Sequence, residues 1–155
     1  DEDLVSYDTN LKLNPPLRTV SDRAALREAV ENGLVDCIAT HHLPQNWDNK
    51  ICEFENAGYG MIGLETVFSV VMSTGCTVER FVEMKTINNR NIFGLPLPSL
   101  SQGAKACLTL FNSNEPWVLE ENKIVSKSKN SPFIGKAFKG KVIGIINGDK
   151  IVLNS

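Results

Sequence analysis

Residues 9–40 read TNLKLNPPLRTVSDRAALREAVENGLVDCIAT, and this stretch decides the fold class. Residues 9–14 alternate between polar and apolar side chains and stop at Pro15-Pro16, which predicts a short strand that cannot continue into a helix. The apolar run at residues 34–40 predicts a second strand. Two strands that flank a helix, joined by short connections, are typical of the βα units of a parallel sheet.

The helix between these strands is expected over residues 22–32. Thr19 or Ser21 can cap its amino terminus, and Gly33 can end it. Three residues define its expected buried face: Leu26, Ala29 and Val30.

After this unit, the α/β pattern continues to about residue 95. Residues 41–63 form a long polar loop, and loops of this length are usually functional or disordered. Helices are expected at residues 64–73 and 77–88, the second with a buried stripe of Val78, Phe81 and Val82.

The remainder of the chain has an all-β pattern. Expected strands are Ala106–Asn112, Trp117–Glu120, Lys141–Ile146 and Lys150–Leu153. Asn147-Gly148 between the last two predicts a type I′ hairpin. We therefore divide the chain into an α/β segment, residues 1–95, and a β segment, residues 96–155.

The composition argues against several classes of function. The chain has 16 basic and 18 acidic residues, so its charge gives no reason to expect nucleic acid or a membrane as a partner. The longest apolar run, residues 67–72, is too short to span a bilayer, and the acidic start is unlike a signal peptide. We expect a cytoplasmic protein. Because the first residue is not Met, we also expect part of a longer one.

The four cysteines do not indicate a metal or redox motif. None of them forms a C-x-x-C pair, so a zinc knuckle or thioredoxin motif is not supported. Two disulfides remain open, but Cys37 and Cys107 lie in apolar runs where a thiol packs as a small hydrophobe. We expect four reduced thiols.

The most unusual local feature is the segment Thr40-His41-His42-Leu43-Pro44-Gln45, directly after an expected strand. Adjacent histidines point to opposite sides of an extended chain, so both rarely bind one metal. One loop histidine bound to the backbone beside one exposed histidine is the simpler interpretation. The carboxyl end of a parallel strand, however, is where barrels and doubly wound folds place their chemistry.

Three segments carry a family resemblance. They are Tyr7–Arg18 (YDTNLKLNPPLR), residues 36–45 (DCIATHHLPQ) and residues 60–66 (GMIGLET). In this order they resemble the segments Y-D-T-N-x-K-x-N-P-P-L-R, D-x-I-A-T-D-H-A-P-H and G-x-x-G-L-E-T of class I dihydroorotases, members of the amidohydrolase superfamily. Leu95-Pro96, Gly103, Leu108–Phe111, Ser131-Pro132-Phe133 and Gly140-Lys141-Val142 are similar to the family's closing β region.

The resemblance spans essentially the whole chain and implies a fold. It implies the last βα units of a metal-containing (β/α)₈ TIM barrel over residues 1–95, followed by part of a small β-sandwich over residues 96–155. Residues 9–14 would be the seventh barrel strand and residues 34–40 the eighth.

The resemblance also implies a reaction, the reversible hydrolysis of the cyclic amide of dihydroorotate to N-carbamoyl-aspartate in pyrimidine biosynthesis. Zinc activates water and polarises the amide carbonyl, while a carboxylate after the eighth strand carries the proton.

Four residues match family positions. Asn14 matches a substrate-binding asparagine, and Gly60 a glycine whose backbone approaches the substrate ring. On residue chemistry alone, Asn14 is equally a turn cap and Gly60 an ordinary turn glycine. His42 matches a family histidine, for which we expect a structural hydrogen-bonding role. Glu65 matches a family glutamate and receives no catalytic role, because the helix dipole alone favours it there.

Two positions depart from the family. His41 stands where the family has its catalytic aspartate, and Gln45 stands where it has a histidine that pairs with the substrate carboxylate. An imidazole can accept a proton but supplies no negative charge, and an amide supplies no positive charge. These departures imply degraded or altered activity.

The family's H-x-H metal ligands and its other ligands have no counterpart in this sequence. We therefore expect zinc in the full-length parent, no metal in this chain, and no activity from this chain alone.

Two other functions remain open. One is a non-catalytic dihydroorotase-like paralogue that acts as a scaffold for aspartate transcarbamoylase. The other is a different cyclic amidohydrolase, such as an allantoinase or hydantoinase, although allantoinases tend to carry cysteine at the position of Asn14. An intact H-x-H and bridging-lysine set upstream would favour an enzyme over a scaffold.

A homo-oligomer is also expected. Two barrel strands without their neighbours would leave open parallel edges, and such edges recruit other chains.

Overall fold

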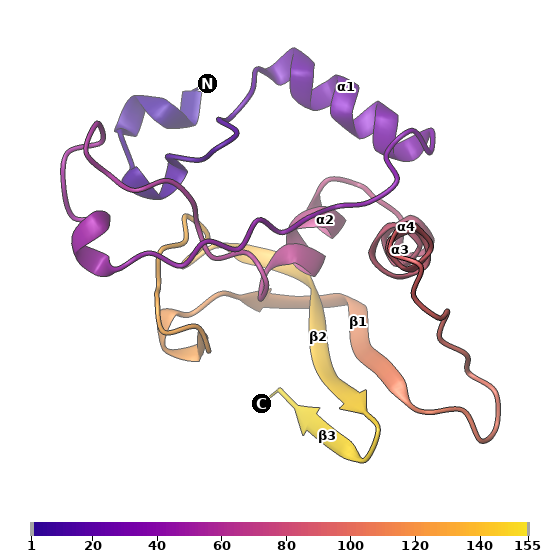
Figure 1. Ribbon diagram of the computed structural model, residues 1–155. Coiled ribbons are helices and arrows are strands. Elements are labelled where there is room, and N and C mark those ends of the chain that lie inside the picture. The colour runs from indigo at the N-terminus through magenta and orange to yellow at the C-terminus, as the bar shows by residue number, and fades with distance from the viewer. Residues whose placement is uncertain (1, 155) are drawn as a thin grey trace.

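An antiparallel sheet forms the carboxy-terminal part of the computed structural model, which describes residues 2–154 (Figure 1). Its strands are β1 (Cys107–Val118), β2 (Ala137–Asn147) and β3 (Lys150–Leu153), in the order β1-β2-β3. The two strands expected at residues 106–112 and 117–120 are the single strand β1, whose register is irregular between Asn112 and Pro116. An edge strand tolerates Pro116, because its outer side needs no ladder hydrogen bond.

The hairpin predicted at Asn147-Gly148 is confirmed, with a different turn type. Asn147 pairs with Lys150, so Gly148 and Asp149 form a two-residue loop. Gly148 has a φ of 65°, whereas Asp149 is not among the described residues with positive φ. A positive φ at the first loop residue only is the pattern of a type II′ turn.

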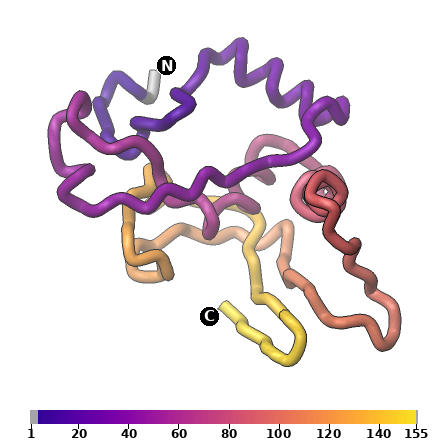
Figure 2. Tube along the Cα trace, viewed as in Figure 1, coloured from indigo at the N-terminus to yellow at the C-terminus, as the bar shows by residue number. Residues whose placement is uncertain are grey.

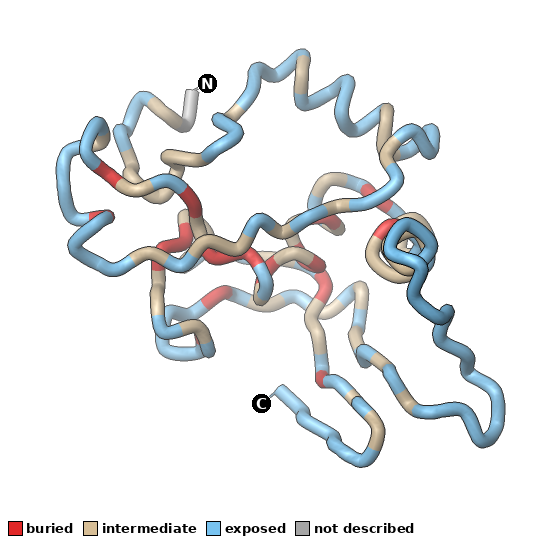
Figure 3. Tube along the Cα trace, viewed as in Figure 1, coloured by how far each residue is buried: buried red, intermediate tan, exposed pale blue. Residues whose placement is uncertain are grey.

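The helix expected over residues 22–32 is α1 (Val20–Glu31). Thr19 and Asp22 form a capping box, in which each side chain accepts a hydrogen bond from the other's backbone N–H at 3.2 Å. The Thr19 hydroxyl also donates to Asp22 Oδ2 (2.9 Å), and this bond together with the one from the Thr19 N–H holds the pKa of Asp22 below its usual value. The expected buried face is confirmed only in part: Ala29 and Val30 are half-buried and Val30 packs against a buried cluster, whereas Leu26 is 58% exposed and α1 has no fully buried residue (Figure 3).

Two helical segments follow the long loop. α2 (Val67–Ser73) confirms the expected helix at residues 64–73. The next runs from α3 (Val78–Val82) through a π-helical turn, Glu83–Ile87, into α4 (Asn88–Ile92). Met84 is buried, whereas Val82, which was expected inside, is 36% exposed.

The strands predicted at residues 9–14 and 34–40 are not formed. Thr9–Leu11 is a 3₁₀ helix, and residues 34–40 have no regular secondary structure. A parallel strand persists only where neighbouring strands complete its hydrogen bonds, and no described strand lies beside either segment.

Side chains of the α3–α4 helix bind part of the residue 34–40 backbone instead. Arg80 Nη2 donates to the carbonyl oxygen of Val35 (2.5 Å) and Lys85 Nζ to that of Ile38 (3.1 Å). The Asn88 side chain donates to the carbonyl oxygen of Asp36 (2.9 Å). A helix thus supplies donors where a neighbouring strand is missing.

Two apolar clusters hold the described chain together. One contains Val71, Cys76 and Met84 and receives side chains from residues 30–38. The other joins Ile62, at the end of the long loop, to Leu119 and Ile124. The loop at residues 41–63 is therefore packed against the β segment.

All four cysteines are free. Cys76 is buried, and burial raises the pKa of its thiol. Cys37, Cys52 and Cys107 are exposed, so the expectation that Cys37 and Cys107 pack as small hydrophobes was wrong. Among the helices of residues 2–154, none combines the length and apolar character that crossing a bilayer requires.

Candidate functional site

The loop at residues 41–63 carries three of the four predicted site residues. Its ends meet in an isolated parallel bridge between His42 and Met61, where Leu43 N donates to Met61 O at 2.9 Å. Within the loop, Gly58 N donates to Asn49 O, also at 2.9 Å. Backbone hydrogen bonds therefore close a loop that contains little regular structure.

His42 has the structural role expected for it. Its Nδ1 accepts hydrogen bonds from the backbone N–H groups of Gly63 (3.0 Å) and Leu64 (3.3 Å), just before α2. An Nδ1 that accepts hydrogen bonds carries no proton, so the neutral ring holds its proton on Nε2. The ring links the start of the loop to its end.

Replacing His42 with alanine is expected to lower the free energy of unfolding by about 1–3 kcal/mol, because the N–H of Gly63 loses its acceptor while buried. His42→Asn should recover part of this loss, since an amide oxygen can accept in a similar place. Urea titration of the purified chain measures both. His41→Asn is the control and should change stability by less than about 0.5 kcal/mol; equal losses at the two positions would contradict the assignment.

His41 lies in a different environment. It is exposed, its φ is 43°, and no hydrogen bond or ion pair is found for its side chain within residues 2–154. A positive φ is uncommon outside glycine, and histidine, asparagine and aspartate tolerate it better than most residues. The described chain therefore leaves the imidazole of His41 facing solvent.

The side chain of Gln45 is occupied within the loop. Its Nε2 donates to the carbonyl oxygen of Tyr59 (2.9 Å), and its Oε1 accepts from Asn49 Nδ2 (3.4 Å). Its backbone N–H donates to Asn130 Oδ1 (3.1 Å). Gln45 therefore helps to hold the loop in place through these hydrogen bonds.

Gly60 has a local reason to be glycine. Its φ is 103°, and a Cβ at this position would lie 2.5 Å from Leu43 Cβ. Its N–H donates to Lys12 O (2.9 Å), and its carbonyl oxygen accepts from Asn130 Nδ2 (3.2 Å). Any side chain here would force Leu43 aside and strain the backbone. The expected approach of the Gly60 backbone to a substrate stays a prediction.

The structure joins some predicted site residues and not others. Gln45 and Gly60 are linked through Tyr59 and through Asn130. Asn14 is exposed, and among residues 2–154 no hydrogen bond connects it or His41 with the other predicted positions. Gly60 N donates to the carbonyl oxygen of Lys12, which lies two residues before Asn14 in the chain.

The residues that the structure describes do not fit a zinc site. Within residues 2–154, no group of three or more His, Cys, Asp or Glu side chains is placed to hold a metal ion. The Nδ1 of His42 is also occupied by two backbone donors. The zinc implied by the family resemblance has no ligand set here.

Lys50 contributes to this region, and sequence reasoning missed it. It is only 8% exposed, and its Nζ donates to the carbonyl oxygens of Thr9 (2.9 Å) and Gly58 (2.7 Å). Burial lowers the pKa of its ammonium group, and the carboxylate of Asp8 acts in the opposite direction. A lysine in a polar loop gives no sequence signal that it will be buried.

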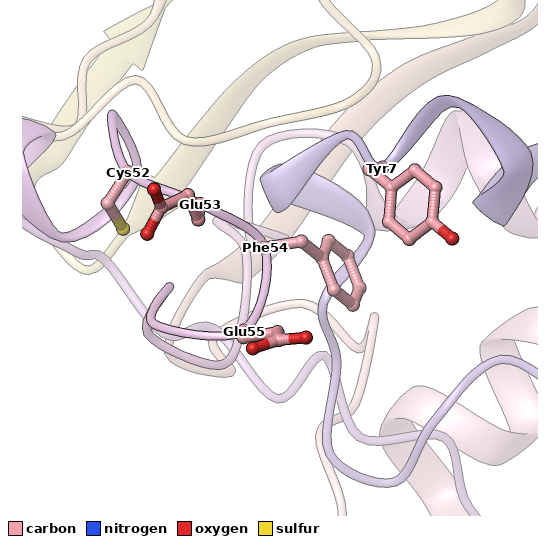
Figure 4. Close-up of a pocket in the computed structure, with 5 residues that line it drawn as sticks. All are labelled: Tyr7, Cys52, Glu53, Phe54 and Glu55. Atoms are coloured by element: carbon pink, nitrogen blue, oxygen red, sulfur yellow. The ribbon is translucent and has the colours of Figure 1, made fainter.

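Two cavities lie near the loop. One, of 530 Å³, is lined by Tyr7 and residues 52–55 and contains none of the predicted site residues (Figure 4). The other, of 420 Å³, lies between residues 45–51 and residues 121–130 and includes Gln45, Lys50 and Asn10. Asn10 Oδ1 is buried without a hydrogen-bond partner. Figure 4 shows the aromatic rings of Tyr7 and Phe54 beside the first cavity, with the carboxylates of Glu53 and Glu55 apart from each other.

Residues 7–152 match the family described as the amidohydrolase family. The chain is 41% identical over 157 residues to the dihydroorotase of Caldicellulosiruptor saccharolyticus and 38% identical to that of Aquifex aeolicus. Each alignment covers 98% of this chain but only 36% and 37% of the relative. The chain therefore spans about a third of the length of the curated relatives it matches, and the expected resemblance to dihydroorotases is confirmed.

Solved structures share the fold. The L-hydantoinase (dihydropyrimidinase) of Arthrobacter aurescens superimposes with a TM-score of 0.85 at 23% identity, over 99% of this chain and 36% of that one. The inactive dihydroorotase-like domain of the Chaetomium thermophilum CAD-like multifunctional protein gives 0.60 at 20% identity, over 89% and 38%. At these identities the likeness shows a mixed α/β fold with a small antiparallel sheet and does not identify a substrate.

Proposed function

Because the chain belongs to the amidohydrolase family, we propose that it forms the carboxy-terminal portion of a dihydroorotase. The full-length enzyme would hydrolyse the cyclic amide of dihydroorotate reversibly to N-carbamoyl-aspartate, a step of pyrimidine biosynthesis. The observation that carries this proposal is the 38–41% identity to curated dihydroorotases along 98% of the chain.

In the full-length protein, residues 1–95 would be the last βα units of a (β/α)₈ barrel and residues 96–155 part of a β-sandwich. The identity to curated dihydroorotases along 98% of the chain supports this arrangement. In a complete barrel, neighbouring strands would take over the carbonyl oxygens of Val35 and Ile38, which Arg80 and Lys85 bind here.

Four positions would face the substrate. Asn14 is exposed, so its amide can offer both a donor and an acceptor to the ring. Gly60 would bring its backbone close to the ring, and Gln45 would hydrogen-bond the carboxylate with the amide hydrogen that Tyr59 does not use. His41 would occupy the place of the proton-carrying aspartate, where an imidazole can take up a proton but brings no negative charge. Zinc would be held by residues outside this chain.

A second function is favoured by the same two departures from the family. Within residues 2–154 no hydrogen bond holds the His41 side chain, Gln45 Nε2 donates to Tyr59, and neither residue supplies the charge of its family counterpart. A non-catalytic dihydroorotase-like scaffold for aspartate transcarbamoylase would tolerate these residues. The likeness in fold to an inactive dihydroorotase-like domain is compatible with this alternative.

The isolated chain is expected to bind no stoichiometric zinc and to leave dihydroorotate intact, because its described residues contain no ligand cluster. The full-length protein is expected to bind zinc and to hydrolyse dihydroorotate measurably. Elemental analysis and an assay of carbamoyl-aspartate formation on both proteins test this. Tightly held zinc in the isolated chain would refute the first expectation. A metal-loaded, folded and inactive full-length protein would favour the scaffold.

A further inference from the structure

We propose that Asn130 is a positioning residue for the candidate site, because its side chain sets where Gln45 and Gly60 lie relative to each other. The inference deepens the proposed function and rests on it for its catalytic consequence. Its structural part can be tested without any activity.

The Asn130 side chain uses all of its hydrogen-bonding groups at this point. Its Nδ2 donates to the carbonyl oxygens of Leu43 (3.0 Å) and Gly60 (3.2 Å), and its Oδ1 accepts from Gln45 N (3.1 Å). Asn130 is 7% exposed, and 70 to 87 positions separate it from these partners. An amide with both donors and its oxygen engaged leaves no freedom to rotate.

These bonds reach both sides of the loop. Gln45 lies shortly after the loop begins and Gly60 near its end, and Leu43 is the residue that packs against Gly60. The backbone of Asn130 adds a fourth link, since its carbonyl oxygen accepts from Ile62 N (3.0 Å). Figure 2 shows the carboxy-terminal segment near residue 130 meeting this loop. One residue therefore holds the two loop positions that are expected to face a substrate.

The segment that carries Asn130 is itself anchored. The carboxylate of Glu65 accepts hydrogen bonds from the backbone N–H groups of Val125 and Ser126, each at 2.9 Å. Ser131 is buried, and its Oγ accepts from Phe133 N (3.2 Å). Phe133 packs on the apolar cluster that contains Ile124. Residues 46–49 of the loop are all exposed. The hydrogen bonds of Asn130 therefore attach this loop to a segment that is itself packed.

The sharpest test is Asn130→Asp, which keeps the shape and turns both donors into an acceptor facing the carbonyl oxygens of Leu43 and Gly60. The matched control is Asn122→Asp, the same change at an exposed position of the 3₁₀ helix Glu121–Lys123. In the isolated chain, amide hydrogen exchange over residues 43–62 is expected to rise roughly ten- to hundredfold for Asn130→Asp. Exchange in the ladder between β1 and β2 should stay within about twofold.

A pH dependence separates positioning from general destabilisation. A protonated carboxyl can donate again, so the excess exchange of Asn130→Asp over wild type should shrink as the pH falls toward about 4. Asn122→Asp should show no such trend. If Asn130→Asp does not fold, Asn130→Ser serves instead, with a smaller rise confined to the same residues. The proposal would be overturned by an equal rise of amide exchange in the loop and in the sheet. It would also be overturned if the excess exchange of Asn130→Asp did not depend on pH.

In the full-length protein, Asn130→Asp should raise KM for dihydroorotate roughly tenfold while kcat changes by less than about threefold, because Gln45 and Gly60 would bind the substrate in its ground state. A fall in kcat at unchanged KM would overturn the catalytic part. If the wild-type full-length protein is inactive, the proposed function fails, and the exchange experiment still decides whether Asn130 positions the loop.

Discussion

Replacing His41 with aspartate is expected to raise the rate at which the full-length protein hydrolyses dihydroorotate by about 10²–10⁴-fold, the usual contribution of general acid–base catalysis. The expectation applies to a protein that carries its other metal ligands. A carboxylate at this position would carry the proton between water and the leaving nitrogen, as the family aspartate does. Steady-state rates of the two proteins at matched zinc content measure the gain.

The structure favours this substitution. The φ of His41 is 43°, and aspartate tolerates this region of backbone conformation as histidine does. The side chain is exposed, and its replacement breaks no hydrogen bond or ion pair within residues 2–154. The change in rate should therefore report on chemistry rather than on folding.

His41→Asn is the matched control, because it has the shape of aspartate and cannot take up a proton. It should not raise the rate above that of the starting protein. Adding Gln45→His to His41→Asp should raise the rate further, since an imidazolium can pair with the substrate carboxylate. If His41→Asp and the double variant both remain inactive although folded and loaded with metal, the site is not a simply degraded dihydroorotase site.

The isolated chain is expected to self-associate, with a mass in solution of at least twice its 17.1 kDa. Its accessible surface is 10630 Å², whereas a folded monomer of this mass exposes about 7,700 Å². The excess is larger than the roughly 800 Å² per partner that a stable interface buries. Light scattering coupled to gel filtration measures the mass.

The apolar edge of the sheet is the surface on which this association should depend. β3 is an edge strand, and Ile151, Val152 and Leu153 are 65%, 56% and 63% exposed. Val152→Lys should weaken self-association, because lysine on an edge strand opposes strand pairing. Val125→Lys, at a valine outside the strands that is 88% exposed, is the control. A well-folded monomer at 17.1 kDa would contradict the edge argument.

Local patterns in the sequence were enough for several elements. The capping box of Thr19 and Asp22 fixes the start of α1, and the two-residue loop after Asn147 fixes the β2–β3 hairpin. Thr19 was one of two expected caps and the hairpin was expected with another turn type; both could be predicted because each depends on hydrogen bonds among residues close in the chain. The motifs around Asn14, His42 and Gly60 likewise identified the family, because they preserve residue types in order.

Other features depend on what packs beside a segment, and sequence patterns describe only the segment. Residues 9–14 and 34–40 have the pattern of strands, but no described neighbour pairs with them. Leu26 lies on the apolar side of α1 and is 58% exposed, whereas Val30 on the same side packs against the cluster that contains Val71. An apolar pattern states which side a segment can bury, whereas burial requires a partner surface.

The sequence by itself determined the family, the helical and hairpin elements, and the two positions at which the site departs from the family, His41 and Gln45. Only the tertiary structure decided that Lys50 is buried between Thr9 and Gly58, that Leu43 requires Gly60 to be glycine, and that Asn130 joins Gln45 to Gly60. Local hydrogen bonds and residue identity are properties of short stretches and can be inferred from them. Contacts between residues separated by dozens of positions form only when the chain folds, so single residues such as Lys50 and Asn130 acquire their roles from their surroundings.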